Sequence, residues 1–289
     1  MNELPLNHSE SVASWLHPAP YGWETLAHLA LEEDIGTGDL SAACFDSEQI
    51  SRFFIETQEE GVISGLGVAA YIFEEVGEVH VSATDGQRVG AGTRVLTVEG
   101  QAGLLLSRER TALNFLMHLS GVATLTSSYV RIVSGTRAKI LDTRKTLPGL
   151  RTMQKYAVRC GGGQNHRMGL YDAPMLKDNH IAACGGIERA VLHLRTRIPH
   201  TSRIEVECES RDQVAEAVSA GADIILLDNM KCELMAAIVE EFGSKVLLEA
   251  SGGINLGTVR AVAETGVDYI SVGALTHSAV ALNFHMEPC

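Results

Sequence analysis

The chain has 289 residues, of which 45% are hydrophobic and 20% are charged, and its formal net charge is −13. This length and composition allow a substantial buried core and argue against an intrinsically disordered chain. The acidic balance, with a pI near 5.3, disfavours nucleic acid as a partner.

Export signals and thiolate metal sites are not expected. The first residues do not form a basic segment followed by an apolar run, and no apolar stretch is long enough to cross a membrane. We therefore expect a cytoplasmic protein. Six cysteines occur without a Cys-x-x-Cys pair, so we expect reduced structural thiols and neither a zinc site nor a dithiol redox site.

The N-terminal part of the sequence predicts an α+β domain. Residues 16–41 are typical of a helix followed by glycine-containing loops. Residues 79–106 alternate short β-prone runs with Asp-Gly and Gly-rich turns, which indicates an antiparallel sheet.

A junction helix is predicted over residues 107–121, with Ser107 as its N-cap and Gly121 just beyond its end. Arg108 and Arg110 would then lie in the first turn, where the helix dipole disfavours cations. This placement either marks a functional site or reflects solvent exposure.

The rest of the chain predicts an α/β domain. Strand-like apolar runs cover residues 203–208, 222–227, 245–250 and 268–273, and 139–142 and 172–177 are two earlier strands. Amphipathic helices ending in glycine cover residues 211–221, 231–243 and 255–266. This alternation predicts a parallel sheet covered by helices, either a barrel or an open doubly wound sheet.

We favour an incomplete, TIM-like parallel α/β barrel, because polar residues and glycine fall where catalytic residues lie in barrel enzymes. The residues at the carboxyl ends of the predicted strands are Glu207, Asp228, Ser251, Gly273 and, upstream, Lys177. The expected organisation is an N-terminal α+β open sandwich domain with its junction helix over 1–121, an α/β barrel catalytic domain over 122–278, and a C-terminal tail over 279–289 that returns to the N-terminal domain.

Residues 137–177 form a basic block, with nine Lys or Arg against Asp142 and Asp172. The local balance of +7 leaves −20 for the remainder of the chain. Like charges repel strongly at short range, so their convergence favours a pocket for a small, heavily negative substrate.

One segment of the basic block has two possible interpretations. Arg151, Lys155 and Arg159 are spaced four apart, which fits a solvated basic helix as well as a pocket. The functional reading is favoured for the cations beside turn glycines and strand ends, which are Arg144, Lys145, His166, Arg167 and Lys177.

Two small-residue loops follow successive strands: Ser251, Gly252 and Gly253, then Val272, Gly273 and Ala274. Their backbone N–H groups, helped by a helix N-terminus, are suited to bind phosphate. Ordinary turns are the alternative reading.

Four acidic side chains lie on these strands. Glu207 and Asp228 suit ribose hydroxyls or a hydrated divalent cation, or else hydrogen bonding to helix N-termini. Glu205 and Asp223 are assigned to structure.

Two side chains of the basic block have alternative chemical roles. Lys177 is either a Schiff-base nucleophile or an anion-binding ammonium. His166 either donates to a substrate carboxylate or serves as an acid or base.

Long motifs give the chain a family resemblance. They cover residues 33–41, 108–121, 141–151, 155–181, 204–210, 225–230, 248–254 and 270–279. The chain resembles bacterial quinolinate phosphoribosyltransferases, also called nicotinate-nucleotide pyrophosphorylases (carboxylating), over nearly its whole length. Ser41 and Leu147 depart from the threonines common in that family, and neither has an assigned role there.

The resemblance implies an N-terminal open sandwich beside an incomplete α/β barrel, in a homodimer whose subunits complete each other's active sites. It implies transfer of phosphoribosyl from phosphoribosyl pyrophosphate to quinolinate, with decarboxylation, giving nicotinate mononucleotide for NAD synthesis. Magnesium (Mg2+) is the implied cofactor.

The resemblance also implies roles for individual residues. Arg144 and Arg167, with His166 and Lys177, match the quinolinate site, and Arg110 matches the arginine lent by the neighbouring subunit. Thr143 and Lys145 complete a segment in which Lys145 reaches the phosphoribosyl donor. Glu207 and Asp228 match the acids that hold ribose hydroxyls and metal-bound water. The two loops, Ser251, Gly252 and Gly253 and then Val272, Gly273 and Ala274, match the phosphate loops. Lys145, Lys177, Glu207 and Asp228 are the expected catalytic residues.

Three rival functions remain. A paralogue with another acceptor acid, such as nicotinate, would not need both Arg144 and Arg167. A Schiff-base lyase would use Lys177. A non-catalytic binding module would not explain the gathering of acids, lysines and phosphate-loop candidates at one barrel edge.

Overall fold

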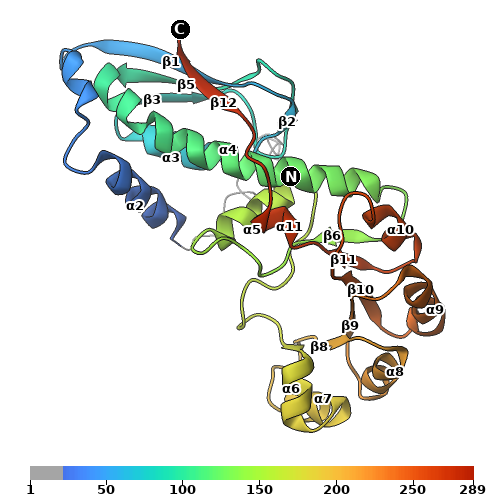
Figure 1. The fold of residues 1–289 in the computed structure, drawn as a ribbon. Helices are drawn as coiled ribbons and strands as arrows, with labels where there is room; N and C mark the ends of the chain where they lie inside the picture. Colours follow the sequence, from blue (N-terminus) through green and yellow to red (C-terminus); the bar gives the residue numbers. More distant parts are fainter. Residues whose placement is uncertain (1–21) are drawn as a thin grey trace, which may run out of the picture. The chain divides into compact units, whose positions relative to one another are not determined.

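The computed structural model describes residues 22–289, and the chain forms two compact units (Figure 1). Among the described residues, the first unit contains residues 22–127, Leu147–Gly162 and Ser278–Cys289. The second contains Ser128–Thr146 and Gly163–His277. Both units are therefore built from segments that are separated in the sequence.

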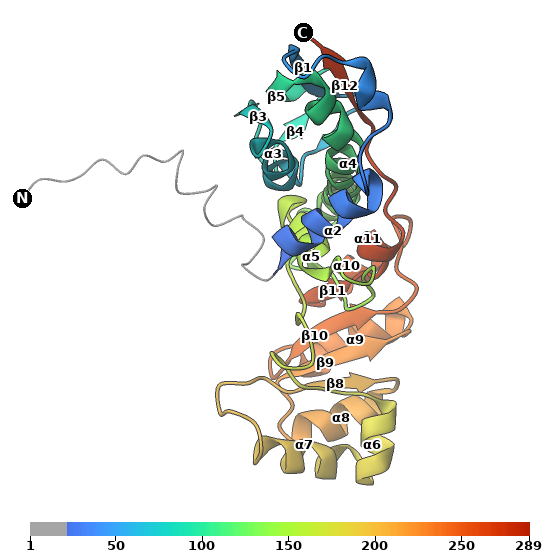
Figure 2. The same ribbon diagram turned by 90° about the vertical axis from the view of Figure 1, so that its left-hand side faces the viewer.

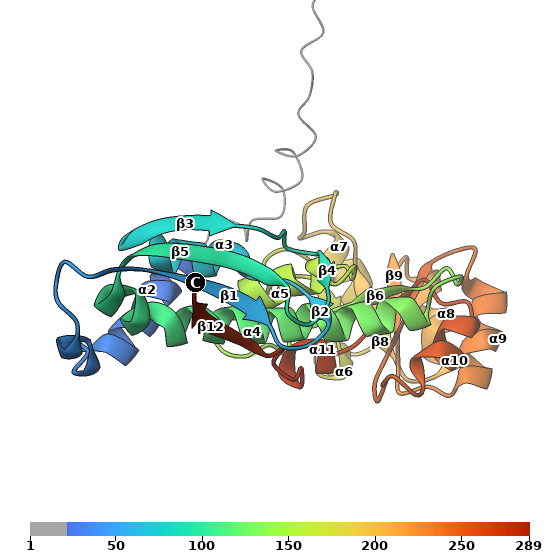
Figure 3. The same ribbon diagram turned by 90° about the horizontal axis from the view of Figure 1, so that it is seen from above.

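An antiparallel sheet forms the framework of the first unit. Its four strands lie in the order β12-β1-β5-β3 (Figure 3). Their bounds are β1 Ile50–Thr57, β3 Gly77–Val81, β5 Arg94–Gln101 and β12 Phe284–Pro288. A separate pair joins β2, Gly61–Val62, to β4, Arg88–Val89. The antiparallel pairing predicted within residues 79–106 is present between β3 and β5, and the C-terminal strand β12 pairs with β1.

Helices complete the first unit. They are α2 Trp23–Ile35, the 3-10 helix Ser41–Cys44, α3 Leu66–Glu74, α4 Ala102–Ile132, which continues into the second unit, and α5 Arg151–Cys160. The helix α3 packs against β3 and β5 through buried side chains that include Ile72 and Phe73. The carboxylate of Asp85 accepts the backbone N–H groups of Gly65 and Leu66 at 3.1 Å, which satisfies free donors where α3 begins.

The predicted ends of the junction helix are wrong. The helix α4 runs without interruption over Ala102–Ile132, so Ser107 is not its N-cap and Gly121 does not end it. A Cβ at Gly121 would lie 2.1 Å from the Val280 carbonyl oxygen, so this glycine permits close packing of the C-terminal segment. Arg108 is also not in a first turn, and it pairs with Glu75 at 3.1 Å.

The solvated-helix reading of α5 is wrong for one of its three cations. Lys155 is fully buried, whereas Arg159 is exposed and Arg151 is intermediate. Gln154, also fully buried, contacts His118 Nε2 at 2.9 Å through its amide nitrogen. The regular spacing of the cations therefore did not define an exposed face.

A six-stranded parallel sheet forms the second unit, in the order β6-β11-β10-β9-β8-β7. The strands are β6 Lys139–Leu141, β7 Met175–Leu176, β8 Glu205–Cys208, β9 Ile224–Asp228, β10 Leu247–Ser251 and β11 Tyr269–Ser271. Figure 2 shows β8, β9 and β10 side by side in this order. The predicted parallel α/β architecture is confirmed. The sheet is open in the described part of the chain, with β6 and β7 as its edges.

Helices follow the strands of this sheet. They are α6 Asp178–Cys184, α7 Ile187–Arg195, α8 Arg211–Ser219, α9 Cys232–Phe242, α10 Val259–Glu264 and α11 Ala274–His277. The helix α8 contacts β8, α10 contacts β11, and α6 to α9 pack in succession. Among the described residues, no helix is both long enough and apolar enough to span a bilayer.

Candidate active site

One edge of the parallel sheet, called the rim below, carries most of the predicted site residues. Because the strands are parallel, their carboxyl ends meet at this edge. In sheet order the rim carries residues 143–145 after β6, 272–274 after β11, 251–253 at the end of β10, Asp228 at the end of β9, Glu207 in β8 and Lys177 after β7. The sheet therefore brings together residues that are far apart in the sequence.

Lys145 and the turn at Gly273 lie in contact at the β6 and β11 end of the rim. The Thr276 hydroxyl donates to the Lys145 carbonyl oxygen at 2.8 Å. A Cβ at Gly273 would lie 3.1 Å from Lys145 Cδ, so the lysine side chain runs close over the glycine. A side chain at this position would have to displace the lysine side chain by a few tenths of an ångström.

Two glycines in the left-handed region shape the loop at the end of β10. Gly252 has φ +97° and Gly253 has φ +61°, a backbone conformation that glycine adopts without steric cost. The helix α10 begins six positions after Gly253 and has only six residues. An anion at this loop would therefore be bound by the backbone N–H groups of the loop, because the N-terminus of α10 is distant in sequence and the helix is short.

The two acids on β8 and β9 have different partners. Lys177 Nζ forms an ion pair with Glu207, and the lysine side chain is half exposed. Asp228 accepts a hydrogen bond from Asn229 Nδ2 at 2.8 Å. A lysine becomes a Schiff-base nucleophile when a desolvated pocket lowers its pKa. Lys177 is instead half exposed and paired with an acid, which disfavours that role.

Arg144 and Arg167 lie close enough for their charges to interact. Burial lowers the pKa of Arg167 and the Arg144 guanidinium lowers it further, against the opposing effects of Glu205 and Asp172. Arg167 Nη1 donates to the Ala173 carbonyl oxygen at 2.9 Å. Two guanidinium groups near one another form a favourable environment for a carboxylate.

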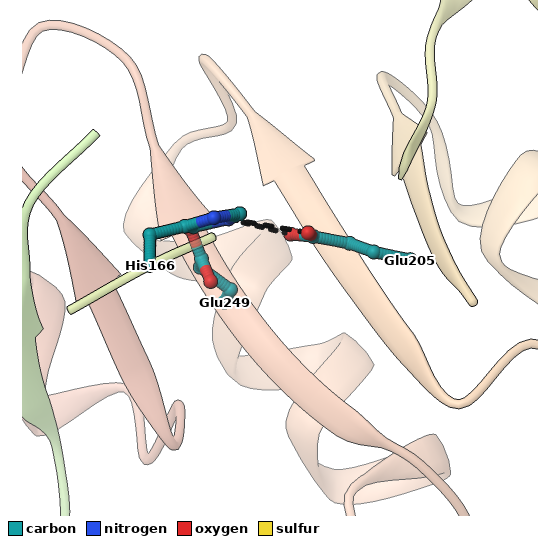
Figure 4. Close-up of side chains that lie close together, drawn as sticks. All are labelled: His166, Glu205 and Glu249. Carbon is teal, nitrogen blue, oxygen red and sulfur yellow. Dashed lines mark hydrogen bonds and ion pairs between the residues drawn. The ribbon is translucent and has the colours of Figure 1, made fainter. Parts of the chain in front are cut away.

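His166 faces a buried pair of carboxyl groups, as Figure 4 shows. Its Nε2 lies 3.1 Å from Glu205 Oε2 and 3.6 Å from Glu249 Oε1. Burial and the nearby Glu205 raise the pKa of Glu249 to about 7, while His166 acts in the opposite direction. The Glu249 carboxyl is therefore partly protonated near neutral pH.

Asp142 extends this cluster. It is fully buried, and it accepts the backbone N–H of His166 at 2.9 Å and an N–H of the Asn165 amide at 2.5 Å. The acid after β6 therefore fixes the segment that carries His166.

Sequence reasoning missed the role of three acids around His166. It assigned Glu205 to structure and overlooked Glu249 and Asp142. An acid within an otherwise apolar strand, as in residues 247–250, was the signal that could have revealed Glu249.

Arg110 lies exposed on α4 in the first unit. Burial raises the pKa of its neighbour Glu109, against the effect of the Arg110 charge. Arg110 is the predicted site residue that belongs to the first unit.

Comparison with known proteins identifies the family. The model of the quinolinate phosphoribosyl transferase N-terminal domain matches residues 39–120, and that of the C-terminal domain matches residues 122–287. A probable nicotinate-nucleotide pyrophosphorylase [carboxylating] of Bacillus subtilis is 44% identical over 265 residues, covering 91% of each chain. A nicotinate-nucleotide pyrophosphorylase [carboxylating] of Mycobacterium leprae is 44% identical over 268 residues, covering 89% of this chain and 94% of that protein.

Solved structures of nicotinate-nucleotide pyrophosphorylases have a similar fold. The nicotinate-nucleotide pyrophosphorylase of Francisella tularensis superposes with a TM-score of 0.87 at 39% identity, covering 92% of this chain and 95% of that one. The enzyme of Ehrlichia chaffeensis gives a TM-score of 0.88 at 38% identity, covering 92% and 98%. The parallel sheet, the polar rim and these matches place the chain in the quinolinate phosphoribosyltransferase family.

Proposed function

We propose that this protein transfers a phosphoribosyl group from phosphoribosyl pyrophosphate to quinolinate, releasing pyrophosphate and CO2 and forming nicotinate mononucleotide for NAD synthesis. The main support for this proposal is the composition of the rim. Cations, two acids and two small-residue loops occupy neighbouring strand ends there. Relatives that are 44% identical over about nine tenths of the chain bear the corresponding names.

Charge complementarity assigns the acceptor subsite. Quinolinate carries two adjacent carboxylates, and Arg144 and Arg167 offer two guanidinium groups that interact with each other. Lys177 adds a further cation at the rim, and His166 accepts a hydrogen bond from the Arg167 backbone N–H. A monocarboxylate acceptor such as nicotinate would leave part of this charge uncompensated.

The phosphate part of the donor subsite is assigned to the ends of β6, β11 and β10. Its phosphates would be bound by Lys145, Thr143 and the backbone N–H groups of residues 251–253 and 272–274. Glu207 and Asp228 would bind the ribose hydroxyls.

Magnesium is the proposed cofactor. Carboxylate oxygens on neighbouring strands are suitable ligands for a hard, hydrated cation, and Glu207 and Asp228 would hold it through water. When bound, magnesium supplies positive charge that stabilises pyrophosphate as a leaving group.

The reaction needs positioning and electrostatics more than a nucleophilic side chain. The pyridine nitrogen forms a bond to the anomeric carbon as the bond to pyrophosphate breaks, and Lys145 stabilises the negative charge that leaves. The bond to the 2-carboxylate then breaks, and its electron pair stays on the ring carbon beside the cationic nitrogen until water supplies a proton. Lys177 acts as an ammonium at the acceptor subsite.

We also propose a homodimer in which Arg110 enters the neighbouring subunit's site. The exposure of Arg110 on α4 and the family resemblance support this assignment. A third guanidinium group would then face the two carboxylates of quinolinate.

The test is incubation with quinolinate, phosphoribosyl pyrophosphate and magnesium, followed by chromatography of the products. We expect nicotinate mononucleotide and CO2 in equal amounts, and no product with nicotinate as acceptor. Comparable turnover of nicotinate would refute the assigned acceptor. Borohydride trapping of Lys177 with substrate would instead support the Schiff-base alternative.

A further inference from the structure

We propose that Asn229 is a positioning residue that sets the separation between Asp228 and the loop of residues 251–253, and thereby controls binding of the phosphoribosyl donor. The inference rests on the proposed function, since it concerns the donor subsite. The residue lies between the two groups that would contact the ribose and a phosphate.

The backbone of Asn229 is in an uncommon conformation. Its φ is +52°, the single positive value among non-glycine residues in the described part of the chain. Asparagine tolerates the left-handed region better than most residues, and such conformations persist where surrounding contacts hold them. One such contact is the Asn229 N–H, which donates to the Ser251 carbonyl oxygen at 2.9 Å.

The Asn229 side chain connects the acid to the loop. Its Nδ2 donates to Asp228 Oδ2 at 2.8 Å, and the carboxylate fixes the amide orientation because it only accepts. The amide oxygen therefore faces the loop. A Cβ added at Gly252 would lie 2.2 Å from Asn229 Oδ1, so the amide occupies the space that a side chain at position 252 would need.

The strand register gives this contact its significance. Asp228 on β9 is paired with Ser251 on β10, so the acid and the loop start from adjacent positions. The amide then determines how far apart the carboxylate and the loop N–H groups stand. The short covalent link between the ribose ring and its 5-phosphate limits the distance from the ring hydroxyls to that phosphate, so a change in this spacing should weaken donor binding.

Asn229→Gly tests the idea because glycine keeps the left-handed backbone and removes only the amide. We expect the Kd for phosphoribosyl pyrophosphate, measured with magnesium, to rise about tenfold, as for loss of a hydrogen bond to a charged group. The Kd for quinolinate should stay within about twofold, and the melting temperature should change little. Asn229→Asp should weaken donor binding at least as much, because a second carboxylate would face Asp228.

A double-mutant cycle shows whether Asn229 acts through the acid. In an Asp228→Asn background, Asn229→Gly should cause a clearly smaller loss of donor affinity than in the wild type. Asn283→Gly, an exposed change in the first unit, is the matched control and should leave both Kd values unchanged.

Failure of the inference and failure of the proposed function give different results. If the wild type forms product and Asp228→Ala weakens donor binding, but Asn229→Gly stays within twofold of wild type, the positioning role is wrong and the function stands. Equal loss of both substrates with a large fall in melting temperature would show a structural residue and also overturn the inference. Absence of product from the wild type would refute the proposed function itself.

Discussion

The backbone N–H of Arg167 donates to His166 Nδ1 at 2.7 Å. This ring nitrogen is therefore an acceptor, and the proton of the neutral ring lies on Nε2, which faces Glu205 and Glu249. A doubly protonated ring would place an Nδ1–H against the Arg167 N–H. In this arrangement His166 links the buried carboxyl pair to the backbone of Arg167.

The raised pKa of Glu249 should make stability depend on pH. The pKa of Glu249 is raised from 4.5 to about 7, so the folded state binds more protons than the unfolded state between these values. Stability should therefore fall as pH rises through this window, by up to about 3 kcal/mol from this residue. Urea denaturation at about pH 5 and about pH 8 measures the difference.

Glu249→Gln is the comparison for this effect. The amide has no titrating proton, so the variant should lose most of the decline in stability between the two pH values. An unchanged decline in the variant would show that other groups cause it.

Arg144→Ala should weaken quinolinate binding selectively. Removing a charged hydrogen-bond partner costs about 1.5–3 kcal/mol, or about ten- to 150-fold in Kd, whereas the Kd for phosphoribosyl pyrophosphate should change far less. Isothermal titration with each substrate alone measures both. Arg159→Ala, an exposed cation on α5, is the control. Retention of quinolinate affinity within about twofold would contradict the assigned role.

Mixed subunits test the shared active site. Arg110→Ala and Lys177→Ala proteins should each be nearly inactive, because every site in either homodimer lacks one cation. After mixing and reassembly, about half the dimers contain one subunit of each kind, and one site in each of these is intact. Activity should recover to about a quarter of wild type. No recovery despite confirmed subunit exchange would mean that Arg110 acts within its own chain.

Gly121→Ala should destabilise the first unit even though alanine favours helix by about 1 kcal/mol over glycine. The added Cβ would meet the Val280 carbonyl oxygen at 2.1 Å, and a backbone atom has little freedom to move. We expect a net loss of at least about 1 kcal/mol in thermal or urea unfolding. Gly103→Ala on the same helix meets its nearest atom, the Ala42 Cβ, at 3.3 Å and should cost less. Equal stability of both variants with the wild type would remove the packing explanation for Gly121.

The sequence by itself determined the parallel architecture and the residues that end its strands. Strands buried on both faces appear as continuous apolar runs, and helices between them have their own periodicity, so β8 to β11 were predicted close to their observed bounds. Glu207 and Asp228 were placed at strand ends for the same reason, because local patterns specify where a strand stops.

Only the tertiary structure decided features that depend on partners distant in the chain. The close approach of the Val280 carbonyl oxygen explains why a glycine occupies position 121 inside a continuous helix. The regular spacing of the cations on α5 did not reveal that Lys155 is buried. The pairing of Glu205 with Glu249 and the position of Asn229 against Gly252 depend on strand register. Contacts of this kind arise when separate segments pack together, and no periodicity within one segment encodes them.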